Sequence, residues 1–198
     1  GHGLSSPDLA IIKSRTGSGR SWVVTHPKLS GSYKAIKLES VNAQLEDSSF
    51  YIDIGSTTLG LAPAGTVNTS LNESSKTFVA YVFKEIEGYS KFGKYTGNAS
   101  SAGPYIWTGF RPRWIMIKES TSTGNWLILD TVRSPENVTN NDSIWANLTS
   151  AEAGSASYLD ILSNGFKIRD TDSDKNTSGQ TYIYIAFAEA PFKYANAR

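Results

Sequence analysis

The stretch Gly109–Asp130, GFRPRWIMIKESTSTGNWLILD, decides how this sequence folds. It contains an apolar run, a turn rich in Ser, Thr and Gly, and a second apolar run that Trp126 opens. Short runs of β-branched and aromatic residues on both sides of such a turn are typical of a β-hairpin. We therefore predict two antiparallel strands in this stretch.

The same arrangement occurs near the start of the chain, in Gly3–Thr25, GLSSPDLAIIKSRTGSGRSWVVT. The two stretches share three pairs of residues at matching places: Pro7 and Pro112, Lys13 and Lys118, and Trp22 and Trp126. Two later segments also recur in the same order: Phe50–Ile54 as Ser157–Ile161, and Thr77–Glu85 as Thr181–Glu189. These matches indicate a duplicated unit of roughly 100 residues, a usual size for a domain.

We predict two tandem copies of one repeat unit, residues 1–93 and residues 94–198. Each copy is expected to carry much of its own core, with Trp22 and Trp126 buried at equivalent places. Residues 88–109, which join the copies, have no counterpart ahead of Gly3. We expect that the chain starts inside a repeat, or that another chain replaces the missing edge strand of the first copy.

The fold class follows from the spacing of apolar residues. Neither copy shows a sustained apolar pattern with a period of 3.6 residues. Short candidate strands alternate with clusters of Gly, Pro, Asn and Ser, and the turn Ser163-Asn164-Gly165 is typical of a hairpin. We predict an all-β fold, an antiparallel β-sandwich of the jelly-roll or lectin-like type, built as two small sandwiches in tandem.

Composition excludes several classes of function. The chain has 198 residues, of which 39% are hydrophobic and 12% aromatic, enough for a packed core. The net charge of +1 creates no field that attracts nucleic acid, and no apolar run approaches the about 18 residues of a membrane span. There is no cysteine, so stability depends on packing. The basic cluster Arg111, Arg113 and Lys118 is expected to be solvated at a strand edge.

Catalytic groups are sparse. The only histidines are His2 and His26, and no Ser-His-Asp arrangement can be assembled from the sequence. Glu85 and Glu87 lie two residues apart, which on a strand places both carboxylates on one face, roughly 6–7 Å apart. Retaining glycosidases hold their carboxyl pair at about 5–5.5 Å, but the Asp that β-sandwich glucanases place between two Glu is missing. We expect no enzyme.

Three carboxylates, Asp170, Asp172 and Asp174, have the spacing of the first three ligands of an EF-hand loop. Lys175 stands where that loop needs Gly, and Thr181 where it needs Glu. Several Asp in one loop still offer the oxygen ligands that Ca²⁺ prefers. A bound calcium ion and a solvated loop therefore both stay open, and we expect no other cofactor.

Aromatic residues beside Asn-rich loops are the strongest binding signal. Flat rings stack on the apolar faces of sugars, and amide side chains hydrogen-bond the hydroxyl groups, which makes a shallow polar site with an apolar floor. The alternative is that these rings fill the core. We predict a carbohydrate-binding site that involves Tyr95, Asn98, Tyr105, Trp107 and Trp145.

Four phrases carry a resemblance to a known family: Phe83–Asn98 (FKEIEGYSKFGKYTGN), Tyr105–Pro112 (YIWTGFRP), Leu162–Lys167 (LSNGFK) and Ala186–Lys193 (AFAEAPFK). The chain resembles, over nearly its whole length, a repeated β-domain of tailed-bacteriophage virion proteins, found in tail fibres and related surface proteins. The resemblance implies a lectin-like β-sandwich that serves virion structure and host attachment, and it brings no catalytic residues. Val82 stands where this family often has Cys.

These observations lead to one main functional hypothesis and two alternatives. The main one is a non-enzymatic virion surface module of the tail-fibre type that helps a phage adsorb to a host-surface glycan or protein. Its expected partners are that receptor, other virion proteins and further copies of itself, and its location is the surface of the particle. The first alternative is a purely structural capsid or tail decoration protein that binds only other virion proteins. The second is a polysaccharide hydrolase, which the missing acid–base constellation disfavours.

Overall fold

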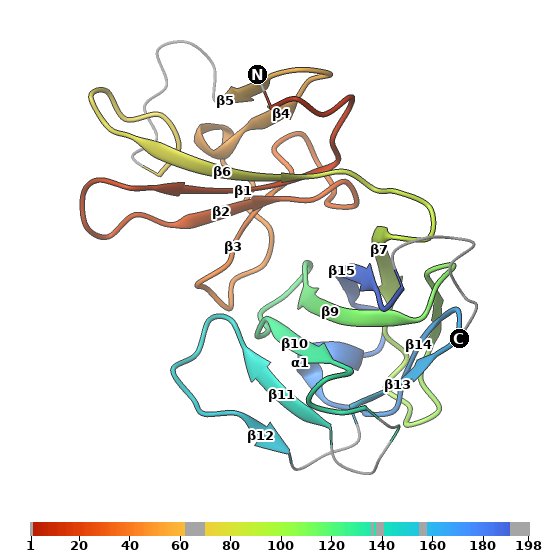
Figure 1. Ribbon diagram of the computed structural model, residues 1–198. Coiled ribbons are helices and arrows are strands. Elements are labelled where there is room, and N and C mark those ends of the chain that lie inside the picture. Colours follow the sequence, from red (N-terminus) through yellow and green to blue (C-terminus); the bar gives the residue numbers. More distant parts are fainter. Residues whose placement is uncertain (1, 62–69, 136, 138–140, 155–157, 191–198) are drawn as a thin grey trace.

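The computed structural model (Figure 1) describes residues 2–61, 70–135, 137, 141–154 and 158–190. The predicted all-β class is confirmed, because nearly all regular structure consists of antiparallel strands. The described strands are β1 Leu9–Ser14, β2 Trp22–Thr25, β3 Ala35–Lys37, β4 Ile52–Ile54, β5 Leu59–Leu61, β6 Phe78–Phe83, β7 Ser90–Thr96, β8 Tyr105–Trp107, β9 Pro112–Glu119, β10 Leu127–Asp130, β11 Asp142–Trp145, β12 Ala153–Gly154, β13 Leu159–Leu162, β14 Gly165–Ile168 and β15 Thr181–Ala188. The described helices are the 3-10 helix η1 Ser48–Phe50 and the α-helix α1 Ser173–Asn176.

Each half of the chain builds a sandwich of two sheets. In the first half the sheet β3-β2-β1-β6 faces the hairpin β4-β5, and in the second half the sheet β12-β11-β10-β9-β15-β7 faces the sheet β13-β14-β8. In both large sheets three consecutive strands form a meander and a later strand returns beside the first of them, which is the order of a Greek key. The hairpin predicted in Gly109–Asp130 is β9 and β10.

The two large sheets share their strand order and register. Strands β6-β1-β2-β3 follow the same order as β15-β9-β10-β11. Lys13 lies opposite Val79 just as Lys118 lies opposite Ile183. The pairing of β2 with β3 also matches that of β10 with β11, because Val24 lies opposite Ile36 and Ile128 lies opposite Ile144. The duplication stays a prediction, and these shared registers are what supports it.

The division between the halves differs from the predicted boundary after residue 93. That position falls inside β7, which pairs with β15 along its whole length. Because a paired strand cannot be divided between two units, the structural division lies in residues 84–89, between β6 and β7.

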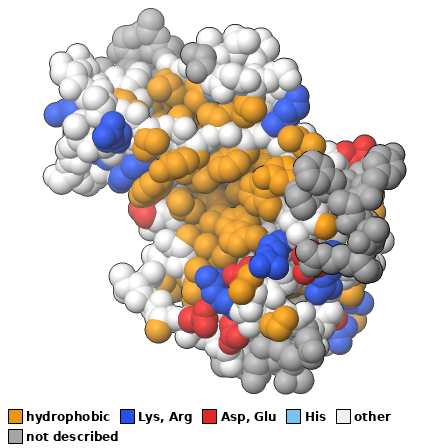
Figure 2. All heavy atoms as spheres, in the orientation of Figure 1, with side chains coloured by type: hydrophobic (Ala, Val, Ile, Leu, Met, Phe, Trp, Pro, Cys, Tyr) orange, Lys and Arg blue, Asp and Glu red, His pale blue; other side chains and the backbone are white. Residues whose placement is uncertain are grey.

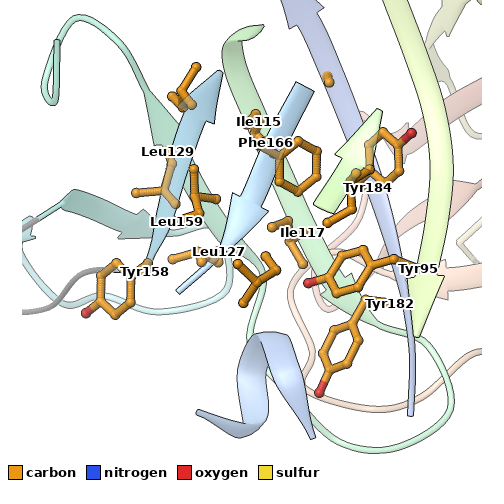
Figure 3. Packing of buried hydrophobic residues seen from close by; sticks show 14 of the residues in the cluster. Tyr95, Ile115, Ile117, Leu127, Leu129, Tyr158, Leu159, Phe166, Tyr182 and Tyr184 are labelled. Carbon is orange, nitrogen blue, oxygen red and sulfur yellow. The ribbon is translucent and has the colours of Figure 1, made fainter. Parts of the chain in front are cut away.

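Three clusters of buried hydrophobic residues hold the layers together. One lies inside the first sandwich and a second, larger one inside the second sandwich (Figure 3). The third lies between the two large sheets and draws on both halves, with Leu9, Val24, Leu29, Ile36, Phe92, Met116, Trp126, Ile128, Ile183 and Ile185. The expectation that each copy carries its own core therefore holds only in part, because this seam cluster belongs to both.

The two matched tryptophans are covered to different extents. Trp126 is 1% exposed in the seam cluster, and its indole N–H donates to the Lys37 carbonyl at 2.9 Å. Trp22 is only half-buried, and its ring stacks on Tyr81 with centroids 6.5 Å apart. The prediction that both are core is thus corrected for Trp22, which is not part of the seam cluster.

His26 links the two halves through the seam. The ring is buried, its Nε2–H donates to the Tyr184 carbonyl at 3.0 Å, and its Nδ1 accepts from the Lys28 amide at 3.2 Å. Only the neutral tautomer with a proton on Nε2 can make both bonds. Burial away from water lowers the pKa of His26 to about 4, and the Tyr184 carbonyl offsets this only in part.

Lys118 makes a second link, at the end of β9. Its ammonium donates to the Val41 carbonyl at 3.1 Å and to the Glu119 carbonyl at 2.6 Å. The side chain is fully buried, and desolvation lowers its pKa to about 8. The expectation of a solvated edge charge is therefore wrong for this residue, because the segment around Val41 covers it.

The pH dependence of stability tests the role of His26. The unfolded chain binds a proton near pH 6.5 but the folded chain only near pH 4, so the contribution of His26 is complete above 6.5 and is lost as the pH falls toward 4. The variant His26→Gln keeps a hydrogen-bond donor but cannot titrate. Between neutral pH and about pH 4.5 we expect its unfolding free energy to fall by about 2 kcal/mol less than that of the wild type. Denaturant unfolding across this range measures it, and parallel curves would contradict it.

Gly93 tests the packing of β7 on β15. The residue lies opposite Tyr184, and a Cβ placed on it would come within 2.4 Å of the Tyr184 ring. We expect Gly93→Ala to cost about 1–3 kcal/mol in unfolding free energy, and less in a Tyr184→Leu background, where the ring is gone. Lys94→Ala, on the exposed neighbour, is the control with a change near zero. Equal costs of Gly93→Ala in both backgrounds would argue against the contact.

Candidate functional site

The five residues predicted to bind sugar do not form one site. Tyr95 is 8% exposed, its ring stacks on Tyr182 at 5.1 Å, and its hydroxyl donates to the Lys175 carbonyl at 2.7 Å (Figure 3). Burial raises the pKa of Tyr95 well above its usual value. Its assignment as a surface contact is corrected, because the ring belongs to the core of the second sandwich.

Asn98 and Trp145 have local structural contacts. The backbone N–H of Asn98 donates to Asn176 Oδ1 at 2.8 Å. The side-chain Oδ1 of Asn98 accepts from the backbone N–H of Ser100 at 3.1 Å, so this side chain shapes the loop that follows β7. Trp145 lies on β11 and is half-buried against the core of the second sandwich, edge-on to Tyr158. Neither side chain lies on β8, which carries Tyr105 and Trp107.

Tyr105 and Trp107 do present aromatic rings to solvent. They are two residues apart on β8, so both point to the outer face of its sheet, and they are 46% and 59% exposed. Tyr105 is held by its hydroxyl, which donates to Asn164 Oδ1 at 2.7 Å. The pair thus forms an exposed aromatic face fixed to the hairpin turn predicted at Asn164-Gly165.

Gly109 holds the Trp107 ring in its orientation. The residue has φ of +86°, and a Cβ on it would lie 3.1 Å from the Trp107 ring, so the indole rests on the bare backbone. The amides of Thr108 and Gly109 both donate to the Asn164 carbonyl, at 3.0 and 3.2 Å. One side of the indole is therefore supported and the other is available to a ligand.

Trp107 borders a cleft of about 460 Å³ where the two halves meet. The other lining residues come from the N-terminal segment, the loop after β2, the link between β6 and β7, the start of β7, and the turn after β8: Ser6, Asp8, Pro27, Lys28, Lys84, Glu85, Glu87, Gly88, Ser90, Lys91, Thr108 and Gly109. A polar and charged wall beside one large exposed ring is a suitable chemistry for a hydroxyl-rich ligand.

The charged groups of this cleft are largely paired with one another. Glu85 Oε1 forms an ion pair with Lys91 at 2.6 Å, and Glu85 Oε2 accepts from the Phe92 amide at 3.1 Å. Asp8 Oδ2 accepts from the Glu85 amide at 2.7 Å. Both Glu85 oxygens are thus engaged in positioning β7, which speaks against a catalytic carboxylate there.

The calcium hypothesis for the Asp170–Asp174 loop is not supported. The Lys175 ammonium, 3% exposed, lies 3.1 Å from Asp170 Oδ2 and 2.8 Å from Asp172 Oδ1 and so supplies the positive charge itself. Asp174 turns away and accepts two hydrogen bonds from Asn125, at 2.7 and 2.9 Å. Among the described residues no group of three potential metal ligands comes together.

Sequence reasoning missed the helix α1 and its lysine. The Asp172 side chain caps this helix by accepting from the Asp174 amide at 2.9 Å. The signal was present, because Asp before a short polar run is a preferred N-cap, and Lys175 follows it at the spacing of a helical ion pair.

In the described part of the chain, no helix has the length and apolar character needed to cross a membrane.

The fold and cleft define an all-β sandwich protein with an exposed aromatic face. The profile of one protein family, described as Domain of unknown function (DUF7483), matches residues 1–191, which include both sandwiches. The chain therefore belongs to this family. The searches of curated proteins and of solved structures found no match.

The pairing of Lys175 with two carboxylates can be tested by removing the ammonium. Lys175→Met leaves Asp170 and Asp172 without a counter-charge, and we expect a loss of about 2–3 kcal/mol in unfolding free energy. The control Lys94→Met, at an exposed position of β7, should change the unfolding free energy little.

We also expect the wild-type melting temperature to be the same in millimolar calcium and in EDTA. A rise with calcium would restore the metal hypothesis.

Proposed function

We propose that this chain is a non-enzymatic surface module of a tailed-bacteriophage virion, of the tail-fibre type, that contributes to host attachment by binding glycan. The observation that carries the proposal is the exposed Trp107 ring at the cleft between the halves. The ring is 59% exposed and lies against Gly109, so it offers a flat apolar surface on which a ligand can stack.

The geometry of β8 supports a sugar rather than a purely apolar ligand. Trp107 and Tyr105 offer two rings on one face, and the adjoining cleft is lined by carboxylates, ammonium groups and hydroxyls. A pyranose has one apolar face for a ring and hydroxyl groups around its edge for such polar partners. The proposed ligand is therefore a cell-surface glycan whose sugar stacks on Trp107.

The virion role has its support in the resemblance of the sequence phrases to phage surface repeats. Two of those phrases, Phe83–Asn98 and Tyr105–Pro112, contribute residues to the cleft. A non-enzymatic role is supported by two observations. Glu85 is paired with Lys91, and His26 is buried and bonded to the Tyr184 carbonyl, so neither group is free for proton transfer. The proposed location is the surface of the particle.

A structural decoration role is the second candidate, and a different surface favours it. Figure 2 shows hydrophobic side chains gathered in the hollow between the two halves. Aromatic rings of both halves meet at the seam. The centroid of the Phe187 ring lies 5.8 Å from that of Phe83 and 6.0 Å from that of Tyr89. Tyr89 is 40% exposed. Exposed apolar surface of this kind suits contact with another protein, so virion proteins are the proposed partners of this region.

Replacement of the indole tests the glycan site. We expect Trp107→Ala to lower the affinity for a bound glycan at least about tenfold, because the stacking surface is lost, while Trp107→Phe keeps part of it. The matched control is Val132→Ala, which removes a 64% exposed apolar side chain from the turn after β10. A glycan array finds the ligand and titration calorimetry measures the affinities.

The same assay separates the candidate functions. Glycan binding that is unchanged in Trp107→Ala would remove this site assignment. If no glycan binds while purified virion proteins do, the decoration role is favoured instead. Hydrolysis of a polysaccharide that is abolished by Glu85→Gln would overturn the non-enzymatic reading.

A further inference from the structure

A second cleft adjoins the one that Trp107 borders. It measures about 270 Å³ and lies in the first half, between the N-terminal segment, the loop after β2 and strand β4. Its lining residues are Pro7, Asp8, Thr25, His26, Pro27, Ser32, Lys34, Tyr51, Ile52, Asp53 and Ile54. Asp8 and Pro27 line both clefts, so the two clefts are neighbours on the molecule.

Four polar side chains of the second cleft have no partner within the described part of the chain. Ser32, Lys34 and Asp53 are exposed, and Tyr51 is half-buried. None of the four makes a hydrogen bond or an ion pair through its side chain with the other described residues. They provide two hydroxyls, one ammonium and one carboxylate. The hydroxyl groups of a sugar both donate and accept, so a cleft with both kinds of partner suits them.

The backbone of β4 adds two more polar groups. The Gly55 amide donates to the Thr58 carbonyl at 2.9 Å, so Gly55 bonds across the β4–β5 hairpin. Bonding alternates along an antiparallel pair, so Ile54, which lies opposite Leu59, directs its N–H and C=O away from β5. Ile54 lines the cleft, and among the described residues no group bonds to either of these backbone groups.

The matching place in the second half is filled by side chains. Ile161 matches Ile54 in the recurring segments, and its amide donates to Asn137 Oδ1 at 2.7 Å. The Ile161 carbonyl accepts from Asn137 Nδ2 at 3.0 Å and from Arg111 at 3.1 Å. The first half has Ser6 at the place of Arg111, and residues 26–34 of its loop after β2 contain no Asn or Gln. The backbone groups that are bonded internally in one half are thus left for a ligand in the other.

The charged groups that line the two clefts balance one another. Four are cationic and four anionic: Lys28, Lys34, Lys84 and Lys91, and Asp8, Asp53, Glu85 and Glu87. His26 adds no charge near neutral pH, because burial lowers its pKa to about 4. An acidic sugar would meet as many carboxylates as ammonium groups, so electrostatics gives it no advantage. The lining therefore favours an uncharged, hydroxyl-rich ligand.

We propose that the two clefts form one groove for an uncharged oligosaccharide, an inference that rests on the glycan site proposed above. One sugar stacks on Trp107, the oligosaccharide passes over Asp8 and Pro27, and a further sugar enters the second cleft. There its hydroxyl groups bond to polar side chains and to the backbone groups of Ile54. The volume of about 270 Å³ lies just below the range of clefts for drug-sized ligands, so it suits a single sugar unit.

The test starts from a glycan array of neutral and acidic oligosaccharides. The probes are the neutral oligosaccharide that binds most strongly on the array and its shortened forms, down to the single sugar. We expect the affinity of the wild type to rise at least about tenfold from the single sugar to the full oligosaccharide, because the second contact is linked to the first. Calorimetry measures the oligosaccharides, and NMR titration measures the single sugar.

Variants separate the two ends of the groove. Lys34→Met combined with Asp53→Leu removes polar partners at exposed positions, so the fold is retained. We expect this double variant to lose the gain in affinity with length and to bind the single sugar as the wild type does. Trp107→Ala should weaken the binding of both. The matched controls are Lys94→Met and Asp160→Leu, the second at the place of Asp53 in the other half, and both should bind as the wild type does.

Hydrogen–deuterium exchange locates the second contact without any substitution. The Ile54 amide should exchange more slowly when the full oligosaccharide is bound, and not when only the single sugar is bound. The Ile161 amide is already bonded to Asn137 and should not change, so it serves as the internal control.

The outcomes distinguish this proposal from the one on which it rests. If no glycan binds, or if Trp107→Ala leaves binding unchanged, the glycan site fails and the groove fails with it. If Trp107→Ala weakens binding but affinity does not rise with length, only the groove is overturned. The same holds if the double variant binds the full oligosaccharide as tightly as the wild type. Tighter binding of acidic oligosaccharides than of neutral ones of equal length would overturn the uncharged class.

Discussion

The alternation of side chains along β15 is the constraint on which this structure depends. Tyr182, Tyr184 and Ala186 enter the core of the second sandwich, while Ile183 and Ile185 enter the seam cluster. A strand whose two faces are both buried must be apolar throughout, and β15 is the longest such run in the chain. Because the backbone of the same strand accepts the His26 bond, β15 holds the second sandwich together and attaches the first one to it.

The difference between the two halves comes from their neighbours more than from their own residues. The strand order and registers match. β15 is covered by β7, whereas no strand among the described residues pairs with the outer side of β6. An aromatic residue can be buried at the place of Tyr184 because β7 supplies Gly93 beneath its ring. At the place of Ala80 nothing comparable is supplied by the described residues, and a cavity results.

The surfaces that remain for function lie where the two halves adjoin or where a sheet ends. The charges near the seam largely neutralise one another, as Glu85 with Lys91 and Arg111 with Glu189. Recognition is then left to shape and to exposed rings such as Trp107. Such surfaces suit contacts made by many copies in an assembly, where each contact can be modest.

The amino-acid sequence by itself determined the all-β class and the hairpin in Gly109–Asp130, because these follow from residue type and short-range spacing. It could not determine which residues are covered by segments far away in the chain. From the sequence, Tyr95 is predicted to lie in a loop, but in the folded chain its ring stacks on Tyr182. The Asp170–Asp174 loop is predicted as a cation site, but in the folded chain Lys175 pairs with two of its carboxylates. Trp22 and Trp126 occupy matching places in the sequence and differ only in what packs over them. Burial is a property of the assembled layers, so only the tertiary structure decided it.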